Sequence, residues 1–251
     1  MSSSALSFRV LIPVRYQSTR LPGKPLLKFQ GKTIIEHVYQ RACESDASSI
    51  HVVTDDERIA DAARKFDADV CMTSGDHQSG TDRITEAVEK IGYKDDEIIV
   101  NLQGDEPQMP ADNIKQVAQL LSASQTASIA TLYSRIHDIQ DYLDPDVVKL
   151  VMAKQQQVLY FSRASIPFVR DEFITEAEDY PLFKHIGLYA YRCSYLKQFV
   201  AYQQTALERL ERLEQLRALE NGDQIIADEC HQMPGISVDT DSDFQRLLLS
   251  E

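Results

Sequence analysis

Short apolar runs alternate with stretches of helical period up to residue 107 of the chain. The apolar runs cover residues 8–14, 49–56, 67–73 and 97–107, and the helical stretches cover residues 33–45, 57–66 and 81–91. In the first helical stretch, apolar residues recur at the period of one helix face, at Ile34, Ile35, Val38, Tyr39 and Ala42. Strands that alternate with helices of this length are typical of βαβ units. The pattern therefore predicts an α/β fold with a mostly parallel sheet flanked by helices.

The second half of the chain has a different pattern, in which apolar runs follow one another more closely. These runs lie at residues 126–134, 147–153, 157–163 and 185–192. The polar stretch at residues 153–157 joins two of them and predicts a hairpin. Since a hairpin is antiparallel, the sheet is expected to be mixed in this portion of the chain.

Two further segments near the C-terminus have clear patterns. Leucines at three-residue spacing, with Glu and Arg between them, predict one continuous helix over residues 205–222, which Asn221 and Gly222 end. Residues 235–251 predict a last strand, a turn and a helix. Because no linker or repeat interrupts the chain, we predict a single domain over residues 1–251, with a mixed-sheet portion around 128–220.

Composition and charge exclude several classes of function. The net charge of −13 argues against general binding to nucleic acid or to an anionic membrane, because both need a broad basic surface. The longest apolar runs fall short of the roughly 18–20 residues of a membrane span, and residues 1–8 do not resemble a signal peptide. The four cysteines show no paired spacing, which favours free thiols over disulfides or a zinc site.

One loop of this acidic chain has the opposite charge. Before the first acidic residue, Glu36, the chain carries the six cations Arg9, Arg15, Arg20, Lys24, Lys28 and Lys32. The loop after the first strand contains several of them together with Ser18 and Gly23, and such loops face the ligand crevice of open α/β sheets. Arg, Lys and Gly together suit a polyphosphate, although the loop matches neither a Walker A nor a GxGxxG motif. The alternative is a solvated basic turn.

Two aspartates follow predicted strands and are candidate metal ligands. Asp105 ends the run VNLQGD, and Asp239 ends the run GISVD. Carboxylates at neighbouring strand ends would suit a Mg²⁺ ion that also binds phosphate oxygens. Taken alone, Asp105 is equally well explained as a turn residue before Pro107, and Asp239 as a helix cap.

Other polar residues allow a structural reading as readily as a functional one. In DHQSGTDR (76–83), Ser79 and Gly80 are placed to present backbone N–H groups to an anion or a base, with Thr81 the expected helix N-cap. Further candidates in apolar surroundings are Arg163, His185, Tyr189, Glu214 and Gln215. Residue type and position alone favour a structural role for each of these five.

The motifs together resemble the 3-deoxy-manno-octulosonate cytidylyltransferase family, the CMP-Kdo synthetases of Gram-negative bacteria. The resemblance covers nearly the whole chain in order and rests on IPVRYQSTRLPGKPL, VVTDDERIA, CMTSGDHQSGTDR, IVNLQGDEP, LYFSRASIPF, KHIGLYAYR, LERLEQLR and GISVDTDSDF. It implies a Rossmann-like fold of the nucleotide-diphospho-sugar transferase type. It also implies Mg²⁺-dependent transfer of CMP from CTP to Kdo by a cytoplasmic homodimer, for lipopolysaccharide biosynthesis.

The resemblance also implies roles for individual residues. Those expected to bind CTP are Arg15, Ser18, Lys24, Ser79, Gly80 and Gln103. Asp105 and Asp239 would bind Mg²⁺, and these two with Arg15 and Lys24 would form the catalytic set. The residues expected to bind the acid sugar are Arg163, His185, Tyr189, Glu214 and Gln215, and the mixed-sheet portion would also support dimerisation.

The chain departs from the family pattern mainly at its sugar end. The segment Gln203–Glu208 replaces a PSPLE run, Phe168 replaces Trp or Tyr, and Arg135 falls in a usually more apolar stretch. These changes leave open a modified Kdo with an 8-amino group, or another acid sugar such as a sialic acid. Outside the family, Asp239–Asp241 matches the DxD motif of nucleotide-sugar glycosyltransferases, and a non-catalytic nucleotide-binding regulator is the remaining alternative.

Overall fold

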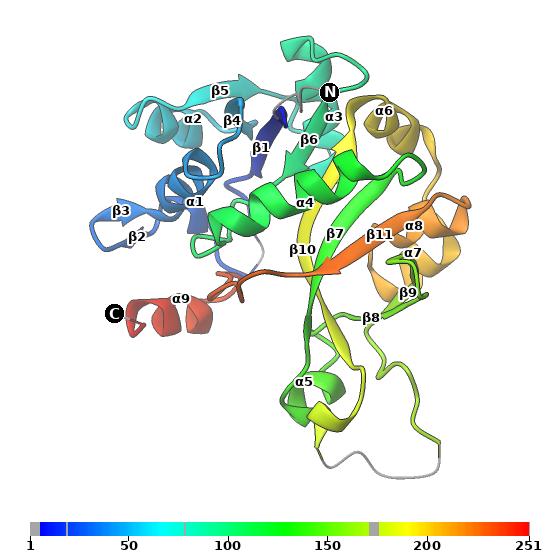
Figure 1. The fold of residues 1–251 in the computed structure, drawn as a ribbon. Coiled ribbons are helices and arrows are strands. Elements are labelled where there is room, and N and C mark those ends of the chain that lie inside the picture. The colour runs from blue at the N-terminus through cyan, green and yellow to red at the C-terminus, as the bar shows by residue number, and fades with distance from the viewer. Residues whose placement is uncertain (1–5, 19, 78, 171–175, 251) are drawn as a thin grey trace.

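A computed structural model of the chain describes residues 6–18, 20–77, 79–170 and 176–250. Thr19 and Gln78, which fall within two of the motifs, lie outside the described residues. The described chain forms a nine-stranded mixed sheet with helices on both faces (Figure 1). The main strand order is β11-β7-β10-β6-β1-β4-β5, and β8 pairs with β10 and with β9. The predicted α/β class with a mixed, mostly parallel sheet is confirmed.

The first half follows the predicted alternation of strands and helices. Its elements are β1 (Phe8–Val14), η1 (Lys24–Leu26), β2 (Lys28–Phe29), β3 (Lys32–Thr33), α1 (Ile34–Cys43), β4 (Ser49–Thr54), α2 (Glu57–Arg64), β5 (Asp69–Met72), α3 (Gly80–Ile91) and β6 (Ile98–Asn101). Strand β1 pairs in parallel with β4 and with β6, and β4 pairs in parallel with β5. The carboxyl ends of these strands therefore share one edge of the sheet.

The second half contains the antiparallel part of the sheet. Its elements are α4 (Ala111–Ala123), β7 (Ile129–Arg135), α5 (Ile139–Leu143), β8 (Lys149–Met152), β9 (Val158–Ser162), η2 (Ala177–Asp179), β10 (Phe183–Arg192), α6 (Cys193–Ala201), α7 (Ala206–Glu211), α8 (Leu216–Glu220), β11 (Ile225–Glu229) and α9 (Asp241–Leu248). Strand β10 runs antiparallel to β6, β7 and β8, and the predicted hairpin is the antiparallel pair β8–β9. The part around α5 and η2 extends away from the main body (Figure 1).

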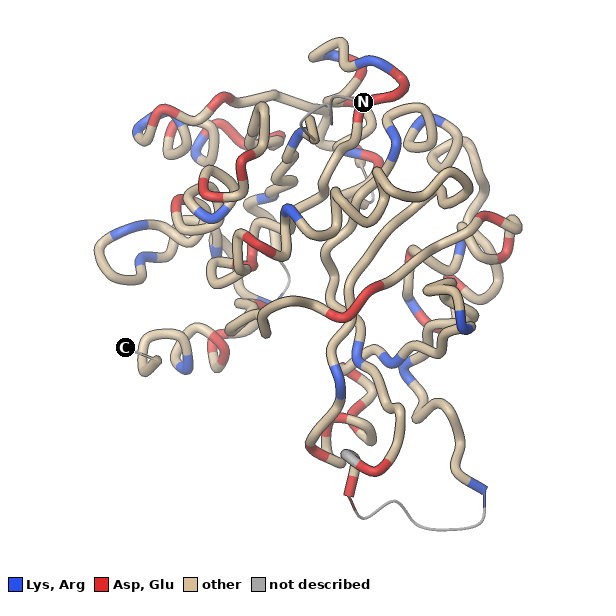
Figure 2. Tube along the Cα trace, in the orientation of Figure 1, with Lys and Arg blue, Asp and Glu red and all other residues tan. Residues whose placement is uncertain are grey.

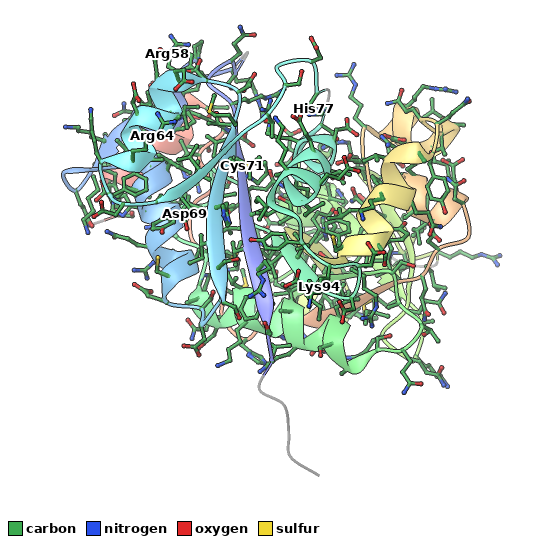
Figure 3. All side chains as sticks on the ribbon, turned by 90° about the horizontal axis from the view of Figure 1, so that it is seen from above. Arg58, Arg64, Asp69, Cys71, His77 and Lys94 are labelled. Atoms are coloured by element: carbon green, nitrogen blue, oxygen red, sulfur yellow. The ribbon has the colours of Figure 1, made fainter. Side chains whose placement is uncertain are left out.

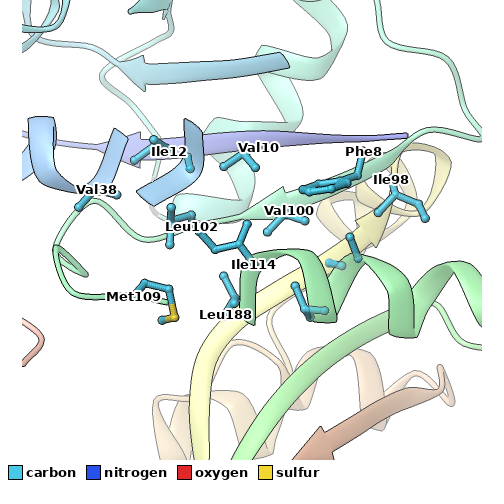
Figure 4. Close-up of a cluster of buried hydrophobic side chains, with 14 of the residues drawn as sticks. Phe8, Val10, Ile12, Val38, Ile98, Val100, Leu102, Met109, Ile114 and Leu188 are labelled. Carbon is cyan, nitrogen blue, oxygen red and sulfur yellow. The ribbon is translucent and has the colours of Figure 1, made fainter. Parts of the chain in front are cut away.

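The core explains why the strands are apolar throughout. Val10 and Ile12 of β1 face one side, where they pack in one cluster with Ile114 of α4 (Figure 4). Leu11, between them in sequence, faces the other side and packs in a second cluster with Ile84 of α3. Since successive residues of a strand point to opposite faces, a strand covered on both sides needs apolar residues at every position.

The predicted continuous helix over 205–222 is wrong. The chain forms α7 and α8 instead, with Arg212 between them in the left-handed conformation at φ 53° and ψ 46°. The helical spacing of the leucines continues across the break, but Leu210 is 81 % exposed whereas Leu213 and Leu216 are buried. The break turns the second group of leucines into the core, whereas Leu210 faces the solvent.

The predicted strand before Asp239 is also wrong. The last strand of the described chain is β11, which ends at Glu229. Residues 230–239 belong to no strand, whereas β11 pairs in parallel with β7. Asp239 is brought to the edge of the sheet because the Val238 N–H donates to the Asp105 carbonyl at 2.9 Å. The N-cap of α3 differs too, since Ser79 and Asp82 form a capping box there and Thr81 lies inside the helix.

A buried ion pair joins α7 to α8 across the break. The Arg217 guanidinium donates to both carboxylate oxygens of Glu208 at 2.9 and 2.6 Å, and both side chains are nearly inaccessible. We expect Glu208→Ala to lower the free energy of unfolding by roughly 3–5 kcal/mol, because it leaves the guanidinium buried without its partner. Urea unfolding measures this, with Arg64→Ala of the exposed pair Arg64–Asp61 as the control, whose loss should stay below about 1 kcal/mol. A loss for Glu208→Ala no larger than the control would contradict this account.

Candidate active site

A cavity opens at the carboxyl edge of the parallel strands, as the strand arrangement requires. Its lining residues are Pro13, Val14, Arg15, Ser18, Arg20, Lys24, Pro25, His77, Ser79, Gly80, Arg83, Gln103, Gly104, Asp105 and Asp239. The structure thus brings together every residue for which the sequence predicted a role with CTP or Mg²⁺. We call this space the nucleotide cavity. Four of its side chains are cationic, whereas acidic residues are spread over much of the chain elsewhere (Figure 2).

A backbone hydrogen bond between Tyr16 and Gly23 closes the base of the basic loop, which we call its neck. The Gly23 N–H donates to the Tyr16 carbonyl at 3.0 Å, and Gly23 has φ 72°, which suits glycine. A Cβ atom on Gly23 would lie 3.1 Å from the Tyr16 hydroxyl, so a larger residue would crowd the neck. The guanidinium carbon of Arg58 lies 3.3 Å from the centre of the Tyr16 ring. Arg58 is at the start of α2 (Figure 3). Lys24 follows the neck directly and is therefore held at the cavity.

Lys24 joins the two candidate metal carboxylates. Its Nζ lies 2.6 Å from Asp105 Oδ2 and 3.1 Å from Asp239 Oδ1, and Arg20 also contacts Asp239 at 3.0 Å. Burial alone would lower the pKa of Lys24, but the two carboxylates outweigh it and the pKa is raised. Lys24 is therefore a firmly charged cation at the centre of the cavity.

The position of the Lys24 ammonium, between Asp105 and Asp239, shows where a cation can be bound in this site. Two carboxylates from different segments already converge on a single cation, and oxygen donors of this kind suit Mg²⁺. Within the described part of the chain, no group of three or more His, Cys, Asp or Glu side chains is placed to hold a metal. Mg²⁺ usually takes one or two carboxylates and completes its shell with phosphates and water, so Asp105 and Asp239 fit such a site.

Three residues of the site had no role predicted from the sequence. Arg83 is buried in the cavity wall, where it donates to Thr73 Oγ1 at 2.7 Å and lies 3.1 Å from Asp55. His77, which also lines the cavity, contacts Glu86 of α3. Glu106 follows Asp105 in the chain, and burial and then the charge of Asp105 raise the pKa of Glu106 to about 7. All three residues lie within the sequence motifs quoted above, and this was the signal from which they could have been identified.

A second cavity adjoins the first and is lined by different chemistry. It is formed by Gly80, Thr81, Asn101, Gln103, Ile129, Tyr189, Tyr191, Phe199, Glu214 and Gln215. Gly80 and Gln103 also line the nucleotide cavity, so the two spaces meet there. We call the second space the sugar cavity. Three of the five predicted sugar residues, Tyr189, Glu214 and Gln215, lie in its wall.

Glu214 is the carboxyl group among the residues that line the sugar cavity. Its Oε2 accepts from Thr81 Oγ1 at 2.9 Å, while its Oε1 is buried without a hydrogen-bond partner among the described residues. Burial raises the pKa of Glu214. A buried acceptor without a partner costs free energy, so it indicates a place for a donor from a bound ligand.

The structure does not place the other two predicted sugar residues in the wall of either cavity. His185 lies behind Tyr189, with its ring 5.2 Å from the tyrosine ring and its Nε2 2.9 Å from Thr131 Oγ1. Burial lowers the pKa of His185 to about 3, which keeps the imidazole neutral. Arg163 donates to the carbonyls of Glu211 at 2.8 Å and Pro145 at 2.9 Å. Contact of these two with a sugar stays a prediction.

Comparisons with known proteins agree with this geometry. The cytidylyltransferase family model matches residues 9–225. A 3-deoxy-manno-octulosonate cytidylyltransferase of Histophilus somni is 47% identical over 250 residues, which cover 96% of this chain and 97% of that protein. The chain belongs to this family. A relative with the same name from Cellvibrio japonicus is 48% identical and covers 96% of the chain.

Solved structures of other proteins have a fold similar to that of this chain. The structure of a CMP:2-keto-3-deoxy-manno-octonic acid synthetase complexed with CTP has a TM-score of 0.89, with 36% identity and coverage of 98% of both chains. A Methanothermobacter nucleotidyl transferase has a TM-score of 0.64 at 13% identity, which shows the shared nucleotidyltransferase fold alone.

Among the described helices, none is both long and apolar enough to cross a membrane. The DxD reading also weakens, because Asp241 begins α9 and does not line the described cavities.

Proposed function

We propose that this protein transfers CMP from CTP to the anomeric hydroxyl of Kdo, releasing pyrophosphate and supplying CMP-Kdo for lipopolysaccharide biosynthesis. The observation that carries the proposal is the pair of adjoining cavities that meet at Gly80 and Gln103. One is rich in cations and suits a triphosphate, whereas the other offers the hydroxyl, amide and carboxyl groups that suit a sugar. Their junction is the place where a sugar hydroxyl would meet the α-phosphorus.

The residues of the nucleotide cavity act mainly by position and charge. Phosphoryl-type transfer needs an in-line approach and neutralisation of the charge that builds on the leaving group. Arg15 and Lys24 would bind the phosphates, Ser18 would assist them, and Ser79 with Gly80 would lie beside the cytosine. Gln103, at the junction of the cavities, would hold the nucleotide against the sugar.

Asp105 and Asp239 would hold Mg²⁺ with the phosphates of CTP. A metal ion there supplies charge neutralisation at the phosphates and makes a sugar hydroxyl more acidic. The support is the convergence of both carboxylates on the Lys24 ammonium. On the sugar side, Tyr189, Glu214 and Gln215 would contact the sugar directly, with His185 and Arg163 as the further predicted residues. From the family resemblance we also propose a cytoplasmic homodimer.

Pyrophosphate release tests the proposed function directly. We would incubate the protein with CTP and Mg²⁺ in parallel with Kdo, its 8-amino analogue, a sialic acid and no acceptor. Release with Kdo, and not without an acceptor, is the expected result. Release with the 8-amino analogue alone would move the assignment to that sugar, and release with none of them would refute the proposed reaction.

A further inference from the structure

The break between α7 and α8 has an arginine where the backbone favours glycine. Arg212 is the C-cap residue of α7 and adopts φ 53° and ψ 46°. Residues with a side chain seldom take this left-handed conformation, and glycine takes it without strain. Other described residues with a side chain also have positive φ, namely Gln30, Asp46, Asp67 and Gln156, but of this group only Arg212 lines a hollow beside the two cavities, which points to a use for its side chain.

The Arg212 side chain lines a third hollow beside the two cavities. Ser79 lines both this hollow and the nucleotide cavity, and Glu214 lines both this hollow and the sugar cavity. The hollow therefore lies against the same edge of the site, on the side of α7 and α8. A group that Arg212 binds would be part of a ligand that also reaches Glu214.

Several charged groups that line the hollow with Arg212 are engaged with other partners. Arg217 and Glu208 neutralise each other in their bidentate pair. Asp82 accepts from the Ser79 N–H in the capping box of α3. Within the described part of the chain, Arg212 itself makes no ion pair and no side-chain hydrogen bond. Its guanidinium is thus available to an anionic ligand.

An acid sugar needs such a cation, and the sugar cavity does not contain one. None of the described residues in the wall of that cavity is a Lys or Arg. Arg163, the arginine that the sequence favoured for the sugar carboxylate, donates instead to two backbone carbonyls. Of the other two arginines in the wall of the hollow, Arg217 is paired with Glu208 and Arg209 donates to the Gln204 carbonyl at 3.4 Å, which leaves Arg212 as the one without a side-chain partner among the described residues. Burial favours the neutral form of its neighbour Glu214.

We propose that Arg212 binds the carboxylate of the acid sugar and thereby selects acid over neutral sugars. This inference rests on the proposed function, because it assigns a partner to the substrate of that reaction. The planar guanidinium binds a carboxylate in bidentate fashion, and the unpartnered Glu214 Oε1 is placed to accept from a hydroxyl of the same ligand. Arg212 would thus determine specificity without taking part in the chemical step.

The variant Arg212→Gly separates this role from a structural one. Glycine suits the backbone here, so we expect an unchanged or higher melting temperature, together with a KM for Kdo raised on the order of tenfold or more. The KM for CTP should change by less than about twofold, since the guanidinium does not line the nucleotide cavity. Arg212→Asn, which also tolerates this conformation, is the second variant and should show the same loss.

Matched controls separate a loss of carboxylate binding from a general effect of the substitution. Gln156→Gly changes another left-handed residue, at φ 61° in the β8–β9 hairpin, and should leave both KM values unchanged. The carboxamide of Kdo should lose little kcat/KM in Arg212→Gly, because it lacks the negative charge. An equal loss for acid and amide, a loss for CTP as well, or a selective loss in Arg163→Ala alone would overturn the proposal. Absence of turnover in the wild-type protein would instead refute the proposed reaction.

Discussion

Asp105→Ala is expected to reduce kcat by at least about a hundredfold while the fold is retained. Removal of one group that stabilises charge in a transition state typically costs on the order of 10²–10³-fold. Asp105 lines the nucleotide cavity and shares Lys24 with Asp239, so its loss removes half of the proposed carboxylate pair. Steady-state pyrophosphate release with saturating CTP and Kdo measures the effect.

Two comparisons make the result specific to a metal role. Asp105→Asn keeps the size of the side chain and loses its charge, so it should resemble Asp105→Ala in kcat. The apparent requirement for Mg²⁺ should also rise in Asp105→Asn, because fewer protein oxygens hold the ion. A variant that turns over like the wild type at the same Mg²⁺ concentration would show that the two-carboxylate site is wrong.

The parts of the site whose position in the fold could be predicted from the sequence depend on local pattern. The run from Phe8 to Val14 is apolar on both faces, and a basic loop after such a strand must reach the carboxyl edge of a parallel sheet. The same rule placed Asp105 in the loop that follows β6, at the same edge of the sheet. Neither step needs a contact between distant segments, which is why periodicity and loop chemistry were sufficient.

The errors arise where distant contacts override a local pattern. Between residues 205 and 222 the helical period continues without a break, yet the Glu208–Arg217 pair and the burial of Leu213 require two short helices. Asp239 lies beside Asp105 at Lys24, but it is not at the end of a strand as predicted. Its segment is held by the hydrogen bond from Val238 to the Asp105 carbonyl and not by a strand.

Lys24→Met is expected to lower kcat/KM for CTP by on the order of 10²–10³-fold and, at the same time, to strengthen metal binding in the absence of nucleotide. The ammonium bridges Asp105 and Asp239, so it competes with a cation for the same oxygens until the phosphates of CTP draw it away. With methionine in its place, Asp105 loses its ion-pair partner and Asp239 keeps only Arg20, so the two carboxylates repel each other more strongly, which a divalent cation relieves.

Titration with Mn²⁺, followed by its paramagnetic signal, measures the second half of this prediction, because it needs neither substrate nor turnover. Lys28→Met, in the same segment but exposed and outside the cavity lining, is the matched control and should bind Mn²⁺ as the wild type does. Weaker Mn²⁺ binding in Lys24→Met would mean that the lysine supports the carboxylates and does not compete for them. Stronger binding together with lost turnover would assign Lys24 to the phosphates and the two aspartates to the metal.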